Sequence, residues 1–146
     1  MADTTKDIDT RRREKGISRT IPVAASTKLY AGALVGVNAA GYAVKGSDTA
    51  SIMIVGRASA QVDNSAGAAG DLSIVVETGV FEYAMSAAAA AVGYAIYKTN
   101  QGKVYVDDDQ TIGLAADAAN SIVAGWAVEI DPVTGKLWVA VGMQGL

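Results

Sequence analysis

The chain has 146 residues, a formal net charge of −3, 51% hydrophobic residues and 18% charged residues. This length suits one domain, and the apolar content excludes a wholly disordered chain. Cysteine and histidine are missing from the sequence, which excludes disulfides and thiolate metal sites and removes the usual general base and the commonest metal ligand.

Residues 1–20 differ from the rest in charge and apolar content. They hold six of the twelve basic residues and four of the fifteen acidic ones, so they carry +2 and residues 21–146 carry −5. Residues 1–20 have too few apolar side chains to form a fold on their own. We predict a charged, flexible N-terminal arm over 1–20 and one domain over 21–146. The polar start has no apolar segment behind it, which predicts no secretory signal and a product that assembles in the cytoplasm.

The arm contains one basic cluster, "RRREKG" (11–16), with acidic residues beside the arginines and no aromatic residue for base stacking. This composition favours an arm that becomes ordered on a protein partner over one that binds nucleic acid. A solvated tail without a binding role is the third interpretation. The extended run "SRTIPVAAS" (18–26) suits strand addition to a partner, because Pro22 cannot donate a ladder hydrogen bond and fits an edge position.

Beyond Ile21 the sequence changes to short alternating runs separated by turns that contain Gly or Asn. The turn "NAAG" (38–41) joins two short strands, and "DNSAGAAGD" (63–71) joins two others. In "LSIVVE", Leu72, Ile74 and Val76 share one face. This period of two is typical of a strand.

The apolar stretch "GVFEYAMSAAAAAVGYAIY" (79–97) contains a single charged residue. It is too short for a membrane helix, which needs about 20 apolar residues. Alternation from Phe81 to Met85 predicts a strand. The alanine run predicts one or two helical turns with Ser86 as N-cap and Gly93 as the stop. "YAIY" then predicts another strand.

The last third of the domain contains further strand patterns. The turn "TNQG" (99–102) is expected to join "YAIYK" to "KVYV", and "DPVTGK" (131–136) to join "GWAVEID" to "KLWVAV". Trp126 and Trp138 either fill the core or lie at a subunit interface. About ten short strands predict an all-β fold, a compact small β-barrel or sandwich with one short Ala-rich helix and the flexible N-terminal arm.

No catalytic pattern stands out. The run "DDD" (Asp107–Asp109) matches no calcium-binding loop and is interpreted as a solvated loop, although clustered carboxylates suit hard cations. A hydrolase acting through this run, or through Glu77 and Glu82, is the enzyme alternative. Three other aspartates are expected to bond to turn backbone: Asp63, Asp71 and Asp131. We predict no enzyme activity, no metal and no cofactor.

The segment "IVGRASAQVDNSAGAAGDLSIVVETGVFEYAMS" resembles the signature of tailed-phage head decoration proteins, also called capsid cement proteins. In that family a "VG-x-A" strand is followed by a loop, a strand, then "G-x-F" and a short turn or helix. Downstream, "AVGYAIYKTNQGKVYV" and "AGWAVEIDPVTGKLWVAVG" resemble the rest of the domain. The likeness covers about four-fifths of the chain.

The resemblance implies a β-rich protein on the outer surface of the phage head, where it would stabilise the mature capsid by bridging major capsid subunits. It also implies a homotrimer, no catalysis, and no direct contact with nucleic acid or membrane. The residues expected to contact the capsid are Arg11, Arg12, Arg13, Lys15, Ile17, Arg19, Ile21 and Val23. A phage tail, fibre or surface β-module that binds a receptor or glycan is the alternative.

Overall fold

A computed structural model describes residues 2–142, with the backbone alone at residues 12–15 and 117. Its elements in chain order are β1 (Arg12–Pro22), β2 (Thr27–Leu29), β3 (Leu34–Val37), β4 (Ala43–Lys45), β5 (Met53–Ala58), β6 (Val62–Asn64), β7 (Ser73–Met85), α1 (Ala87–Val92), the 3₁₀ segments Gly93–Tyr97 and Thr99–Gly102, β8 (Lys103–Asp108), β9 (Thr111–Gly113), the 3₁₀ segment Ala115–Asp117, β10 (Val123–Ile130) and β11 (Leu137–Val141). The predicted all-β class, with about ten short strands and one short alanine helix, is confirmed.

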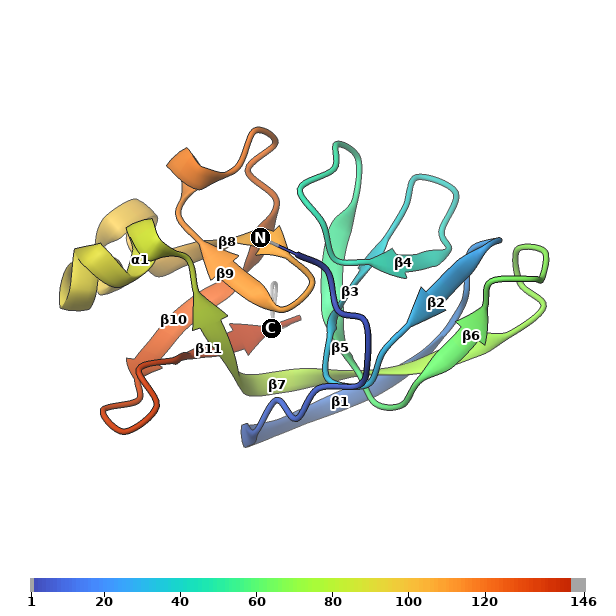
Figure 1. The fold of residues 1–146 in the computed structure, drawn as a ribbon, viewed down its shortest axis with the longest axis horizontal. Coiled ribbons are helices and arrows are strands. Elements are labelled where there is room, and N and C mark those ends of the chain that lie inside the picture. Colours follow the sequence, from blue (N-terminus) through green and yellow to red (C-terminus); the bar gives the residue numbers. More distant parts are fainter. Residues whose placement is uncertain (1, 143–146) are drawn as a thin grey trace.

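Nine strands form one sheet in the order β11-β10-β8-β9-β7-β5-β3-β4, with β1 attached to β7 and β11 also paired to β7. Strands β2 and β6 form a separate pair. The long strand β7 runs beneath both halves of the molecule in Figure 1 and connects them. Its length follows from a run without proline that is rich in β-branched and aromatic residues.

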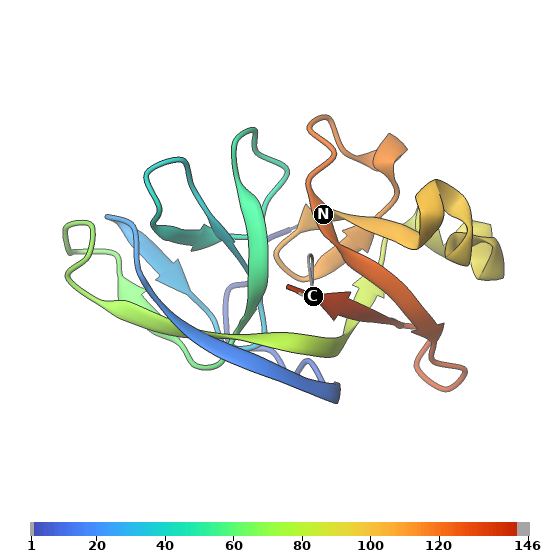
Figure 2. The ribbon, with the colours of Figure 1, turned by 180° about the vertical axis from the view of Figure 1, so that it is seen from behind.

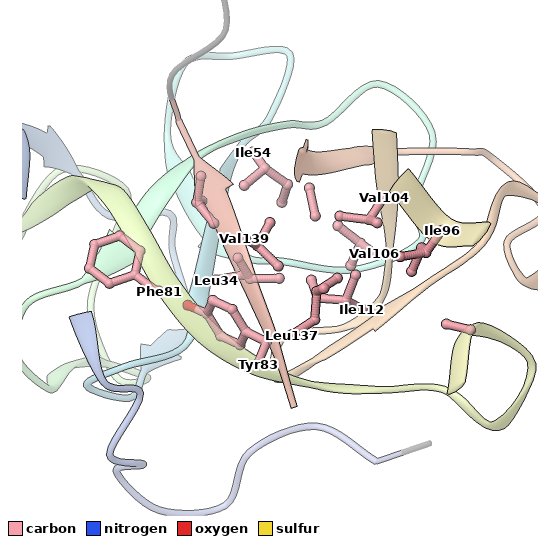
Figure 3. Packing of buried hydrophobic residues seen from close by; sticks show 13 residues of the cluster. Leu34, Ile54, Phe81, Tyr83, Ile96, Val104, Val106, Ile112, Leu137 and Val139 are labelled. Atoms are coloured by element: carbon pink, nitrogen blue, oxygen red, sulfur yellow. The ribbon is translucent and has the colours of Figure 1, made fainter. Parts of the chain in front are cut away.

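Two hydrophobic clusters share β7. Ile74 and Val76, from the first part of β7, pack with residues of β3, β4 and β5. Phe81 and Tyr83, from its second part, pack with β8, β9, β10 and β11, as Figure 3 shows. Of the three residues predicted to share one face of "LSIVVE", Ile74 and Val76 are both buried, whereas Leu72 precedes β7 and is exposed.

Helix α1 begins and ends as the sequence predicts. The Ser86 hydroxyl accepts a hydrogen bond from Ala89 N at 3.2 Å, and Gly93 ends the helix with φ 61°. The strand predicted for "YAIY" is wrong, because the chain tightens into 3₁₀ turns over Gly93–Tyr97. A 3₁₀ helix has three residues per turn, so residues three apart lie on the same side of it. Tyr94 and Tyr97 accordingly lie close together, while Ile96 is buried. The "TNQG" hairpin therefore does not form.

Within the described part of the chain, every helix is too short or too polar to cross a membrane.

The predicted boundary between residues 20 and 21 falls inside β1. Strand β1 is antiparallel to β7 along most of its length, from Arg12 opposite Phe81 to Pro22 opposite Ser73. Figure 2 shows β1 lying along β7. The basic cluster is therefore held on the domain by a backbone ladder.

Candidate interaction surface

Residues 2–11, here called the N-terminal strap, contact the turn between β8 and β9. Thr4 donates to the Asp109 carboxylate from its backbone N at 2.9 Å and from its hydroxyl at 2.6 Å. Lys45 Nζ donates to the Thr4 carbonyl at 3.2 Å. Thr4 is buried, although it lies in a segment with little apolar content. Polar contacts therefore hold this end of the strap.

The interpretation of Asp107–Asp109 as a solvated loop is wrong, because Asp108 and Asp109 are buried. Burial raises the pKa of Asp109, and the two hydrogen bonds from Thr4 offset part of that rise. Within residues 2–142, apart from the side chains left undescribed, no three His, Cys, Asp or Glu residues gather in a geometry that could hold a metal ion. The Asp109 carboxylate binds the strap instead.

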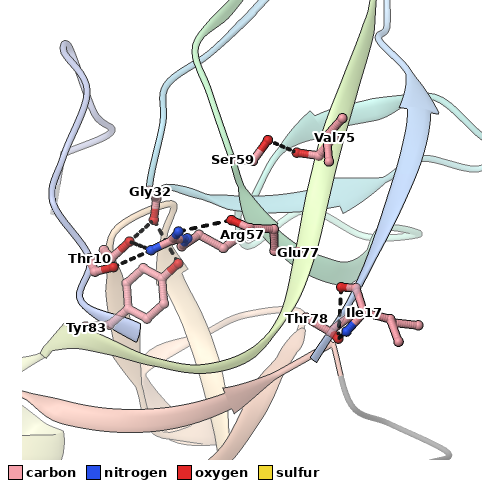
Figure 4. Close-up of polar contacts among 9 residues, drawn as sticks. All are labelled: Thr10, Ile17, Gly32, Arg57, Ser59, Val75, Glu77, Thr78 and Tyr83. Carbon is pink, nitrogen blue, oxygen red and sulfur yellow. Dashed lines mark hydrogen bonds and ion pairs between the residues drawn. The ribbon is translucent and has the colours of Figure 1, made fainter. Parts of the chain in front are cut away.

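The other end of the strap enters a buried polar cluster, which Figure 4 shows. The hydroxyls of Thr10 and Tyr83 both donate to the Gly32 carbonyl, at 2.9 and 2.8 Å. Arg57 donates to the Thr10 carbonyl and pairs with Glu77 at 3.0 Å. Burial raises the pKa of Tyr83 far above its ordinary value. The carboxylate of Glu77 is thus part of an ion pair that fixes the strap to β5 and β7.

Arg11 forms a second cluster with residues of β7 and the β10–β11 hairpin. Its Nη1 lies 3.5 Å from Glu82 and 3.7 Å from Asp131. The guanidinium lies over the Trp138 ring, 5.3 Å from its centre, and Trp138 Nε1 donates to Asp131 at 3.3 Å. Glu77 and Glu82, proposed above as catalytic alternatives, are therefore each paired with an arginine.

Strand β1 is the most basic element of the chain. Residues 12–22 hold four basic residues and one acidic residue, so they carry +3 while the remaining residues together carry −6. The β1–β7 register shifts between Lys15 and Ser18. There, Ile17 N donates to the Thr78 hydroxyl at 2.8 Å, and a Cβ at Gly16 would lie 2.3 Å from that hydroxyl oxygen. Only glycine fits at position 16 of this bulge. Ile17, the next residue, is exposed.

One edge of β1 bonds β7 and the other faces away from it. Val23 N donates to the Leu72 carbonyl at 2.9 Å, and Ala24 N donates in the other direction, to Ala43 O of β4 at 3.0 Å. Bonding directions alternate along an antiparallel strand. Thr20, an even number of residues from Ala24, therefore directs its backbone N–H and C=O away from β7. In the described residues, β7 is the only strand that pairs with β1.

A groove of about 920 Å³ lies beside this outer edge. One wall is formed by residues 19–22 of β1, and the opposite wall by the β3–β4 turn and the beginning of β5. An isolated bridge between Val23 and Ala43 joins the end of β1 to β4. Apolar side chains from both walls line the groove: Ile21, Val37, Ile52, Met53 and Val55.

The expected capsid-contact residues lie in different environments. Arg11 is held in the ion-pair cluster and Arg19 Nη2 donates to the Val55 carbonyl at 2.9 Å. Ile21 lines the groove, and Val23 is fully buried in the core. The backbones of Arg12, Arg13 and Lys15 lie in β1. The structure brings Arg19 and Ile21 together at the groove, and a capsid contact by these residues stays a prediction.

The two tryptophans also differ. Trp138 is buried, whereas Trp126 is partly buried and lines a second groove with Ile52, Met53 and Ile122. Ile52 and Met53 are therefore shared by both grooves. A subunit contact at either tryptophan stays a prediction.

Sequence reasoning missed the opposite wall of the groove. Met53 is 67% exposed, but "SIMIVG" has the pattern of any short strand. No local sequence pattern shows that Met53 lines a groove together with Val37 and Val55, because the groove depends on how β3, β4 and β5 curve. Thr4 was missed for the same reason, since its partner Asp109 is 105 residues away.

Comparison of the chain with protein-family models, with curated proteins and with solved structures finds no match.

Proposed function

We propose that this protein decorates the outer surface of a mature phage capsid and stabilises the shell by bridging major capsid subunits. The observation that carries the proposal is β1, a basic strand on an otherwise acidic chain, with one edge directed away from its own sheet. Such an edge can pair with an extended segment of another chain. The sequence resemblance to head decoration proteins supports the same function.

The charges on β1 suit an acidic partner surface. Arg12, Arg13 and Lys15 give the first part of the strand a concentrated positive charge. Opposite charges across an interface raise the association rate and exclude partners of like charge. The proposed role needs no catalysis, metal, cofactor, nucleic acid or membrane. Its partner is the major capsid protein, and its location is the outside of the virion.

Co-sedimentation with expanded, undecorated capsids of a tailed phage tests the proposal. The full chain should bind saturably, at a fixed ratio to capsid protein. The double variant Arg12→Glu/Lys15→Glu should lose most of this binding. Lys98→Glu/Lys136→Glu is the matched control, because it makes the same change in net charge at exposed residues outside β1. Failure of the full chain to bind any shell would refute the proposal.

The same proposal includes a homotrimer. Trp126, partly buried beside Ile52 and Ile122 in the second groove, is the residue we expect at the contact between copies. Trp→Ala at interface centres commonly costs 2 kcal/mol or more. Sedimentation equilibrium should therefore show a trimer for the full chain and dissociation for Trp126→Ala. A monomer at all concentrations would remove the trimer from the proposal.

An exposed aromatic pair favours a second candidate, a receptor- or glycan-binding module. Tyr94 is 72% exposed, and its ring lies 6.2 Å from that of Tyr97. Tyr97 also accepts a hydrogen bond from Ile130 N at 3.0 Å, which gives it a structural role in fixing the 3₁₀ turn to β10. Glycan-array binding by the full chain, lost in Tyr94→Ala without any shell present, would favour this candidate.

A further inference from the structure

The groove beside β1 lies where the hydrophobic cluster that contains Ile74 and Val76 reaches the surface. The cluster contains buried Val23, Val35 and Val76, and its partly buried members Ile21 and Val55 are also groove residues. Beyond the bridge between Val23 and Ala43, β1 and the β3–β4 turn do not pair in the described residues. The sheet therefore has an open seam with an apolar floor.

We propose that this seam binds an extended acidic segment of a partner protein, which adds to the outer edge of β1 as a strand and places alternate apolar side chains in the groove. Assigning the segment to the capsid protein rests on the proposed function. The preference for an extended acidic segment rests on the seam alone.

Geometry favours an extended chain as the occupant. The wall formed by residues 19–22 is four residues long, or about 13 Å of strand, which accommodates two side chains of an added strand on the groove side. Thr20 directs one backbone donor and one acceptor toward the incoming chain, as derived above from the bonding of Val23 and Ala24. Ile21 and Met53 supply apolar surface on opposite walls.

Charge decides which extended chain fits. Arg19 is the one charged residue among those lining the groove, and it continues the positive charge of β1. If a second copy of the chain paired through β1, two strands that each carry a net charge of +3 would lie side by side and repel each other. A nucleic acid would meet an apolar lining without an aromatic residue for base stacking. An extended acidic peptide segment can bond to the outer backbone edge of β1, place apolar side chains in the groove and complement the positive charge of Arg19.

Selection of a random dodecapeptide library on the folded full-length protein tests this inference without any capsid. We expect enriched peptides with acidic residues and with apolar residues at alternate positions. Two variants should weaken their binding by about tenfold, the effect of losing one good interaction. Thr20→Pro removes the outward backbone N–H, and Met53→Glu places a negative charge in the groove.

Two matched variants separate these effects from general damage. Thr20→Val keeps the backbone N–H of Thr20 and changes only the side chain. Val133→Glu makes an apolar-to-acid change like Met53→Glu, at a residue that is 90% exposed on the β10–β11 turn. Both should bind the selected peptides within about twofold of the original protein. Should Thr20→Pro fail to fold, judged by circular dichroism, Met53→Glu and its control carry the test.

Four results would overturn the inference: no enriched peptide family, enriched peptides that bind both groove variants fully, competition by a single-stranded oligonucleotide, or self-association of the protein that Thr20→Pro abolishes. The last two would assign the edge to nucleic acid or to a second copy. Shell binding tests the proposed function separately. Peptide binding without shell binding would refute decoration alone, and shell binding that survives both groove variants would refute the assignment of the segment to the capsid protein.

Discussion

At the scale of single residues, Gly56 shows how closely β5 and β7 approach. Its φ is 155°, and a Cβ there would lie 2.4 Å from the Glu77 carbonyl oxygen. We expect Gly56→Ala to lower the free energy of unfolding by about 3 kcal/mol, through strain and overpacking together. Urea unfolding measures the change.

Gly41→Ala is the control for Gly56→Ala, because Gly41 has φ +91° but no atom within 4 Å of its Cβ position. Backbone strain alone should cost about 1 kcal/mol there. Equal losses in the two variants would show that close approach to Glu77 contributes nothing.

Asp109 gives the protein a pH dependence of defined sign. Burial raises its folded-state pKa above the ordinary 3.8, opposed by the Thr4 hydrogen bonds and Lys45 and reinforced by Asp3. The folded state thus holds this proton more tightly than the unfolded chain. Its contribution to stability is complete below pH 3.8 and is lost as the pH rises through the folded-state pKa.

Asp109→Asn should therefore be less sensitive to pH in that window and at least as stable as the original protein at about pH 7. Its amide oxygen can still accept from Thr4 N. Denaturant unfolding between about pH 4 and 7 measures this. Asp63→Asn is the contrast, because hydrogen bonds from Ser65 lower the pKa of Asp63 and its contribution is lost as the pH falls. A steeper pH dependence in Asp109→Asn would contradict the expectation.

At the scale of elements, β1 belongs to the folded domain. It pairs with β7 from Arg12 to Pro22, and removing it would open one edge of β7. A chain that starts at Arg12 loses only the strap, and we expect its melting temperature to fall by about 5 °C. A chain that starts at Ile21 should lose far more, because the β1–β7 ladder goes with it. Equal melting temperatures for both would mean that β1 contributes nothing to the fold.

Elements with clear local signals are the ones that the sequence predicted. Alternation located β7, β10 and β11, and the cap at Ser86 located α1. The 3₁₀ segment Gly93–Tyr97 was mistaken for a strand, because four residues with two aromatics do not distinguish a period of two from a period of three. The ladder between β1 and β7 was missed because its partners are about 60 residues apart and charged residues dominate β1.

The candidate site was predicted only in part. The basic cluster and the extended run with Pro22 are visible in the sequence, and both lie in or beside β1. The groove needs Val37 and Met53 to face β1 across the seam, and that depends on the curvature of three strands. The burial of Asp109 was missed for a similar reason. Three adjacent aspartates predict a solvated loop, and only the contact with the distant strap buries Asp109.

At the scale of the whole molecule, β7 couples the two hydrophobic clusters. Ile74 lies in one cluster, while Trp138 is on β11, which packs in the other. Ile74→Ala should cost about 3 kcal/mol. Since β7 is common to both clusters, thermal unfolding followed by tryptophan fluorescence and by circular dichroism should shift together. A fluorescence transition that stays in place while circular dichroism shifts would show two independently folding halves.

The bulge in β1 has a consequence for the protein before it meets any partner. A long, flat strand edge is a template for uncontrolled aggregation into fibrils. Here the register shift near Gly16 interrupts the ladder, the sequence before it is rich in basic residues, and Pro22 at the far end has no N–H to donate. These features oppose edge-to-edge polymerisation of the free protein, even at high concentration.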